Sequence, residues 1–261
     1  MQTQTIAATR RPVCDLVQRA VLAPLVRRYF RLTVRSTTDL AALPTPCIFA
    51  ANHSSHLDSL AILAALPEAV RARTRVAAAE DYWYRSPLRR LAAAMCGAFP
   101  FPRKGYGGVA RGAALLDAGW SVLLYPAGTR EQGNGFRRGV ALLAGTTGRP
   151  VVPVAVAGSG AILPKGRHLP RRGTLTLTFG APLAVAPDSS PDEATAAIAA
   201  AVGALLDTRA GDEAFAGPRF VIDTALLSAQ AGDEPPQHRG RREVTGLPSA
   251  GALAARPQTG D

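Results

Sequence analysis

Short apolar runs alternate along the chain with segments in which hydrophobic residues recur at helical spacing. The runs end at Gly, Pro or polar residues, which is typical of β-strands. The segments around 58–66, 86–96, 109–118 and 137–147 predict helices. Because strands that alternate with helices form parallel units, we expect an α/β fold: a single domain with a central, largely parallel or mixed sheet flanked by helices. The strands are expected at 47–51, 75–79, 97–101, 121–126, 151–158 and 174–180.

The domain boundaries follow from composition. Residues 190–207, SPDEATAAIAAAVGALLD, begin with Ser, Pro and acidic residues, as an N-capped helix does, and predict the closing helix of the domain. From Gln230 onward the sequence is rich in Gly, Pro and charge without a sustained period, which predicts a disordered tail at 230–261. We therefore expect a basic amphipathic segment at 1–34 and one folded domain at 35–229.

The N-terminal segment has two open interpretations. Apolar side chains recur at roughly helical spacing over 17–29, with arginines around them, and Pro24 would kink such a helix. It can be an interfacial helix on anionic lipid, or an ordinary amphipathic helix packed on the domain. Because Arg19, Arg27 and Arg28 interrupt the apolar positions, we expect neither a signal peptide nor a membrane-spanning helix here.

Charge indicates an anionic partner without choosing one. Lys and Arg number 30 against 19 Asp and Glu, a formal charge of +11. Such a surface attracts anionic lipid, phosphorylated substrates or nucleic acid, although this Arg-rich composition can also reflect genomic base composition. No nucleic-acid partner is expected, because aromatic residues make up only 6% and no binding module is recognisable.

Cys14, Cys47 and Cys96 are widely spaced and form no CxxC pair, which favours a reducing compartment.

The most informative stretch is ANHSSHLD, residues 51–58, between a predicted strand and a predicted helix. Five residues of α-helix turn through about 500°, so His53 and Asp58 can meet only if His53 lies in the turn before the helix. Ser54 or Ser55 would then be the N-cap. A carboxylate on one ring nitrogen fixes the tautomer and leaves the other nitrogen as a general base.

Other interpretations use the same residues. His53, His56 and Asp58 could ligate a metal ion, but their spacing fits no zinc pattern and we expect no metal. All could instead be capping and turn groups, because an isolated H-x-x-x-x-D is common by chance.

The pattern is not isolated, and this decides between the interpretations. NHSSHLD (52–58) is followed by FPFPRKG (99–105), YPAGTR (125–130) and VVPVAVAG (151–158). In this order and at these intervals, over residues 20–185, the motifs resemble the glycerolipid acyltransferase family typified by lysophosphatidic acid acyltransferases. That family shows N-H-x-S-x-x-D, an aromatic-rich strand ending in Arg, F-P-E-G-T-R and V-P-V.

The resemblance implies roles for the matching residues. His53 would be the general base for an acceptor hydroxyl and Asp58 would orient it, with backbone N–H groups of the turn available for the developing oxyanion. Arg103 and the Gly128-Thr129-Arg130 turn would bind the acceptor phosphate. It implies an acyl thioester, from acyl-CoA or acyl carrier protein, as co-substrate, a lysophospholipid as acceptor, no tightly bound cofactor, and a peripheral position on the cytoplasmic face of a membrane with anionic lipids.

Two departures leave the acceptor open. Ala127 stands where the family has Glu, and Pro102 precedes Arg103 where an acidic or polar residue is usual. We expect an O-acyltransferase acting on a lysophospholipid, first of all 1-acylglycerol-3-phosphate, in phospholipid biosynthesis. The alternatives are a catalytically weak membrane-peripheral homologue, suggested by Ala127, and a thioesterase-like hydrolase that uses the same pair to activate water. Cys96 lies among apolar residues and is expected to be buried and structural.

Overall fold

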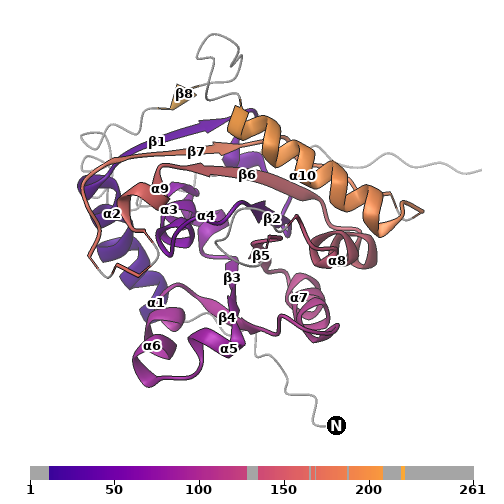
Figure 1. The fold of residues 1–261 in the computed structure, drawn as a ribbon, viewed down its shortest axis with the longest axis horizontal. Helices are drawn as coiled ribbons and strands as arrows, with labels where there is room; N and C mark the ends of the chain where they lie inside the picture. Colours follow the sequence, from indigo (N-terminus) through magenta and orange to yellow (C-terminus); the bar gives the residue numbers. More distant parts are fainter. Residues whose placement is uncertain are drawn as a thin grey trace, which may run out of the picture. The chain divides into compact units, whose positions relative to one another are not determined.

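A computed structural model gives the architecture (Figure 1). It describes residues 12–127, 135–164, 166–167, 169–186, 188–207 and 219–220, and only the backbone of 12–14, 22 and 219–220. The described residues belong to one compact unit, residues 1–224. The predicted tail and the expected site residues Gly128, Thr129 and Arg130 lie outside the described residues.

The strands form one mixed sheet in the order β4-β3-β5-β2-β6-β7-β1-β8. Pairing is parallel except between β6 and β7 and between β1 and β8. The α/β fold class with a largely parallel or mixed sheet is confirmed, and all six predicted strands are present. The strands are β1 (Arg31–Ser36), β2 (Ile48–Ala51), β3 (Thr74–Ala79), β4 (Ala98–Phe101), β5 (Ser121–Leu124), β6 (Val151–Ala157), β7 (Thr174–Phe179) and β8 (Arg219–Phe220).

Strand β1 was not predicted from the sequence. Its residues, RLTVRS, include two arginines and only Val34 and Ser36 are buried, so the apolar signal is weak. It becomes a strand because it pairs in parallel with β7 over its whole length. Tertiary pairing, rather than local pattern, therefore decides its structure.

Helices cover both faces of the sheet (Figure 1). Strand β2 is buried on both sides: Phe49 belongs to a core with α2 and α3, and Ile48 to a core with α7, α8 and α10. The helical elements are α1 (Pro12–Val17), η1 (Gln18–Leu22, π-helical), α2 (Ala23–Tyr29), η2 (Leu40–Ala42, 3₁₀), α3 (Leu57–Ala65), α4 (Glu68–Arg71), α5 (Glu80–Trp83), α6 (Pro87–Met95), α7 (Gly107–Asp117), α8 (Gly139–Thr147), α9 (Ser159–Ile162) and α10 (Pro191–Asp207).

The N-terminal helix packs on the domain by one side only. Ala23 and Val26 of α2 are buried, whereas Leu16, Val21 and Leu25 are exposed. The irregularity expected at Pro24 takes the form of the π-helical stretch η1, which immediately precedes α2. Proline cannot donate the hydrogen bond of a regular helix and its ring crowds the carbonyl four residues earlier, so the helix widens there.

Two other sequence features have clear structural outcomes. The closing helix α10 begins with a capping box, in which Ser190 Oγ accepts from Glu193 N (3.2 Å) and Glu193 Oε2 accepts from Ser190 N (3.1 Å). Pro153 lies within β6 beside β2, but the regular β6–β7 ladder begins one residue later, at Val154. The missing N–H of Pro153 therefore breaks no bond of that ladder.

In the described part of the chain, every helix is too short or too polar to cross a bilayer.

Candidate active site

The candidate site lies where parallel strands end. Strands β4, β3, β5 and β2 are adjacent and parallel, so their carboxyl ends meet at one edge of the sheet. Ligands of α/β proteins bind outside such edges. The segments that follow these four strands supply Arg103, Asp81, Tyr125 and His53. Residues separated by up to 72 positions in the sequence, His53 and Tyr125, are thereby brought into one site.

His53 and Asp58 form the predicted pair. His53 Nδ1 lies 2.9 Å from Asp58 Oδ2, and because a carboxylate only accepts, the ring donates. Asp58 is fully buried, whereas the His53 side chain is 16% exposed. Because Nδ1 carries the proton that is donated to Asp58, the other ring nitrogen, Nε2, is unprotonated and can act as a base.

The turn around Asp58 is held by the carboxylate itself. Asp58 Oδ2 also accepts from Ser54 N (2.7 Å) and Ser55 N (2.9 Å). Our expectation that turn amides bind the oxyanion fails for these two, because both already donate to Asp58. The predicted N-cap also shifts: His56 occupies that position without a capping bond, while Ser55 Oγ accepts from Leu57 N (3.3 Å).

Asn52 fixes the turn to the sheet. Its side-chain amide donates to Val156 O (2.8 Å), and its side-chain oxygen accepts from Val156 N (2.7 Å). This pair of bonds mimics a strand pairing at the end of β6. On the far side, Ser55 Oγ donates to Leu163 O (2.9 Å). The residues on both sides of His53 are thus tied to β6 and to the segment after α9, which fixes the position of the imidazole.

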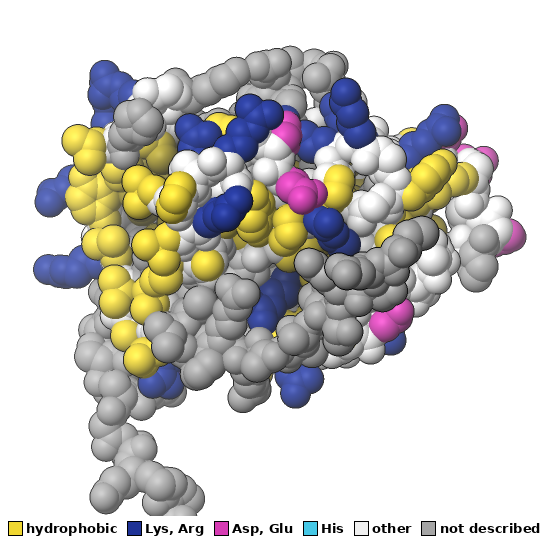
Figure 2. Space-filling view, turned by 90° about the horizontal axis from the view of Figure 1, so that it is seen from below, with side chains coloured by type: hydrophobic (Ala, Val, Ile, Leu, Met, Phe, Trp, Pro, Cys, Tyr) yellow, Lys and Arg dark blue, Asp and Glu magenta, His cyan; other side chains and the backbone are white. Residues whose placement is uncertain are grey.

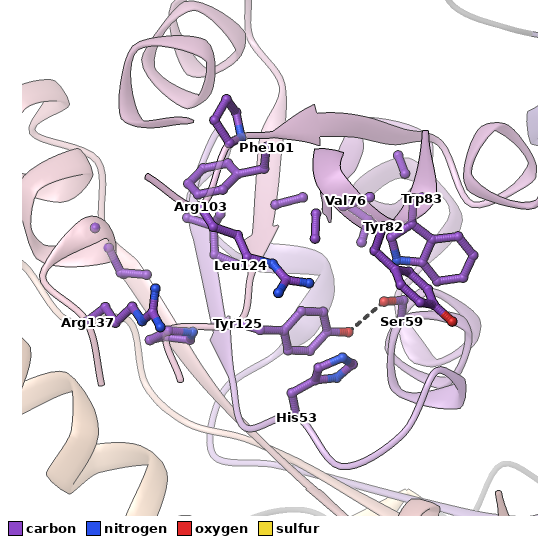
Figure 3. A pocket seen from close by; sticks show the side chains of 18 of the residues that line it. His53, Ser59, Val76, Tyr82, Trp83, Phe101, Arg103, Leu124, Tyr125 and Arg137 are labelled. Carbon is purple, nitrogen blue, oxygen red and sulfur yellow. Dashed lines mark hydrogen bonds between the residues drawn. The ribbon is translucent and has the colours of Figure 1, made fainter. Parts of the chain in front are cut away.

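Tyr125 is a site residue that sequence analysis did not single out. Its ring stacks on His53, with centroids 4.1 Å apart, and its hydroxyl lies 2.7 Å from Ser59 Oγ of α3 (Figure 3). Burial, with the nearby Asp58 carboxylate, raises the pKa of Tyr125 well above its ordinary value, so the phenol stays neutral. The signal that could have found it is its place directly after β5, inside the YPAGTR motif.

A cavity of about 750 Å³ opens beside His53. Small and apolar side chains from β3, α6, α7 and α8 form much of its wall, while His53, Arg103 and Arg137 bring polar groups to it (Figure 3). Such a mixture suits a ligand with an apolar chain and an anionic group. Cys96 lines this cavity and is half-buried, so the expectation that it is buried is wrong.

The predicted acceptor residues are only partly described. Arg103 lines the cavity, and its Nε lies 3.3 Å from Asp81 Oδ1 of α5. Arg137, which was not among the predicted site residues, also lines it. Ala127, at the position of the family Glu, is half-buried. The two arginines place cationic groups in the same cavity as His53.

The second histidine of the motif belongs to an aromatic cluster. The His56 ring stacks with Tyr82, at 5.6 Å between centroids, and meets the edge of Trp83 at 5.0 Å. Within the described ranges, no group of three or more His, Cys, Asp or Glu side chains could hold a metal ion.

Comparison with known proteins agrees with this geometry. Residues 31–157 match the sequence model of the family described as Acyltransferase. They form an acyltransferase-family domain. The family expected from the motifs is thereby confirmed, and the match covers β1 through β6, including His53 and Asp58.

Named relatives of this acyltransferase domain are plant enzymes. The chain is 28% identical over 145 residues to chloroplastic 1-acyl-sn-glycerol-3-phosphate acyltransferases, BAT2 of Brassica napus and LPAT1 of Arabidopsis thaliana. The alignments cover 53% of this chain and only 40% and 39% of those proteins, so the chain spans about two fifths of their length.

A solved structure has the same fold as this domain. The crystal structure of the 1-acyl-sn-glycerophosphate (LPA) acyltransferase PlsC from Thermotoga maritima superposes with a TM-score of 0.61. The two sequences are 20% identical, and the matched region covers 78% of this chain and 85% of the PlsC chain.

Proposed function

We propose that the protein transfers a fatty acyl group from an acyl thioester to a hydroxyl of a lysophospholipid, with 1-acylglycerol-3-phosphate as the first acceptor to test. The observation that carries this proposal is the His53–Asp58 pair, 2.9 Å apart, beside a cavity that also holds Arg103. The named relatives are 1-acyl-sn-glycerol-3-phosphate acyltransferases, which supports the choice of acceptor.

The proposed chemistry needs one base and one carboxylate. His53 Nε2 takes the proton of the acceptor hydroxyl as its oxygen attacks the thioester carbonyl carbon. The tetrahedral intermediate collapses, the carbon–sulfur bond breaks, and the imidazolium returns the proton to the leaving thiolate. Asp58, charged and buried, stabilises the imidazolium and holds Nδ1–H, so Nε2 is kept as the base. No acyl-enzyme is formed in this sequence.

The acceptor phosphate is proposed to bind Arg103, with Arg137 as a second cation. Arg103 is held by Asp81 at 3.3 Å, a distance and exposure that allow the guanidinium to exchange partners with an incoming phosphate. We further propose, from the motif alone, that Gly128, Thr129 and Arg130 contribute to the same phosphate site. The apolar wall of the cavity is proposed to hold an acyl chain.

We also propose that the protein works at the cytoplasmic face of a membrane without spanning it. Its proposed substrate resides in a bilayer, and the exposed Leu16, Val21 and Leu25 on the basic N-terminal helix provide an apolar side for contact. Acyl-CoA and acyl carrier protein both remain candidate donors, and no tightly bound cofactor takes part.

The test follows a radiolabelled acyl group from acyl-CoA, and separately from acyl carrier protein, into a panel of lysophospholipids. Wild type should label one lipid class, and His53→Ala should lower turnover by about 10²- to 10⁴-fold, the usual contribution of a general base. His56→Ala is the matched control, because it removes the other histidine of the turn and leaves the His53–Asp58 pair. Label only in free fatty acid would establish a hydrolase instead, and full turnover by His53→Ala would reject the proposed base.

A further inference from the structure

Helix α6 exposes leucines that no described part of the protein covers. Leu88 is 77% exposed and Leu91 is 59% exposed, and three residues of helix place both on one side. The N-terminal helix contributes the exposed Leu16, Val21 and Leu25. We call these five residues the leucine face. Figure 2 shows hydrophobic side chains gathered on the side of the molecule where Figure 1 places α1, α2 and α6.

The two helical parts of the leucine face are joined by a hydrogen bond from a buried side chain. Gln18 is only 6% exposed, and its side-chain amide donates to Met95 O at the end of α6 (2.9 Å). A buried amide that finds its partner on the other helix fixes one relative to the other. The leucine face is therefore one surface rather than two independent patches.

Helix α6 is also a wall of the cavity. Ala92, Ala93 and Cys96 line the cavity, and Ala92 is at the same time exposed to solvent. Ala92 lies close to Leu88 on the helical wheel, about 40° away at 100° per residue. The exposed leucines and the cavity wall are therefore successive sides of one short helix, and the leucine face reaches the cavity through Ala92.

Arginines surround this apolar surface. Arg28, Arg85, Arg89 and Arg90 are exposed. Figure 2 shows basic side chains at the margin of the same hydrophobic region. The carboxylate of Glu68 lies 3.3 Å from the guanidinium of Arg19, so the negative charge of Glu68 is offset. An apolar strip with a basic border is complementary to a bilayer of anionic lipid, whose acyl region accepts leucine and whose headgroups accept arginine.

We propose that α6 is a second membrane-docking helix, which seats the leucine face on anionic lipid so that the mouth of the cavity meets the bilayer. A lipid acceptor would then pass from the membrane into the cavity along α6 without crossing water. This role in substrate delivery rests on the proposed function, whereas the docking itself does not.

The experiment is co-sedimentation of the full chain with phosphatidylglycerol–phosphatidylcholine vesicles and with pure phosphatidylcholine vesicles. Wild type should bind the anionic vesicles. The double variant Leu88→Ser, Leu91→Ser should bind them at least about tenfold more weakly, because two apolar side chains that would enter the acyl region of the bilayer are lost. Leu88→Met, Leu91→Met is the matched variant, which keeps the apolar surface and should bind as wild type. Unchanged binding by the double serine variant would overturn the proposal.

The arginine border is tested in the same assay. Arg89→Gln, Arg90→Gln should weaken binding to anionic vesicles and reduce its sensitivity to salt, whereas Arg138→Gln, which removes an exposed arginine paired with Asp192 on α10, should change neither. If Arg138→Gln weakens binding equally, general positive charge explains it and the proposal fails.

Delivery is tested by kinetics. The double serine variant should keep the wild-type kcat/KM for a short-chain monomeric acceptor and lose activity on the same headgroup in vesicles. If the wild type shows no acyl transfer at all, the proposed function has failed, and vesicle binding still decides the docking proposal. A dimer that disperses in the double serine variant, without vesicle binding, would identify the leucine face as a contact between copies and overturn the proposal.

Discussion

Replacing Asp58 separates two roles of one carboxylate. In the protein, Oδ2 accepts three hydrogen bonds, from His53 Nδ1, Ser54 N and Ser55 N, while Oδ1 has no hydrogen-bond partner among the described residues. Asp58→Asn can place its oxygen at the Oδ2 position and keep all three bonds. Asp58→Ala removes them. The asparagine variant therefore loses mainly charge, and the alanine variant loses charge and structure.

The sizes of the two losses differ. At the 2.9 Å of the His53–Asp58 contact, an effective dielectric of about 20 gives a Coulomb interaction of at most about 6 kcal/mol with an imidazolium. A charged hydrogen bond contributes about 1.5–3 kcal/mol, which sets the lower end. We expect kcat of Asp58→Asn to fall about 10²- to 10⁴-fold. Its stability should fall by about 1–3 kcal/mol, because its amide NH₂ meets no acceptor.

For Asp58→Ala, two backbone donors lose their acceptor, the half-buried Ser54 N and the buried Ser55 N. At about 1–3 kcal/mol each, unfolding in urea should show a loss of about 2–6 kcal/mol, clearly more than for Asp58→Asn. The assay pairs acyl-transfer kinetics with urea unfolding for both variants and for His53→Ala combined with Asp58→Asn. The combination should be no slower than His53→Ala alone, because the two residues act as a unit. Wild-type kcat in Asp58→Asn, or equal stability of the two Asp58 variants, would refute this reasoning.

The remaining predictions concern other parts of the protein. Arg103→Gln should raise the KM for a phosphorylated acceptor about 10- to 100-fold and leave a monoacylglycerol without phosphate unaffected; equal effects on both would exclude phosphate binding. Ser190→Ala should cost about 1 kcal/mol in urea unfolding by removing the cap of α10. Hydrogen bonds from Ser190 lower the pKa of Glu193, so the wild type should lose part of its stability as pH falls through that lowered pKa, whereas Glu193→Gln should not show this loss. Gly108→Ala puts a Cβ 2.6 Å from an aromatic ring of β4 and should lower stability by about 1–3 kcal/mol, while Gly107→Ala, with its nearest contact at 3.6 Å, should not.

The sequence by itself determined six of the strands and the family. Continuous apolar runs such as CIFAA and SVLLYP predict strands that are buried on both faces, and the structure has them as β2 and β5. The spacing of His53 and Asp58 allowed their contact only in a turn before a helix, and the structure places them there. These conclusions depend on local geometry, which the residues of a short stretch of sequence specify by themselves.

Only the tertiary structure decided which distant residues share the site. Tyr125 and Arg103 reach His53 because β5 and β4 lie on the same side of β2 in the strand order, with their carboxyl ends at one edge. The use of the Ser54 and Ser55 amides by Asp58, and the half-exposed position of Cys96 in the cavity wall, likewise follow from packing. Local periodicity specifies how a segment folds, but strand order and burial depend on contacts between segments far apart in the chain, and those contacts exist only once the core has formed.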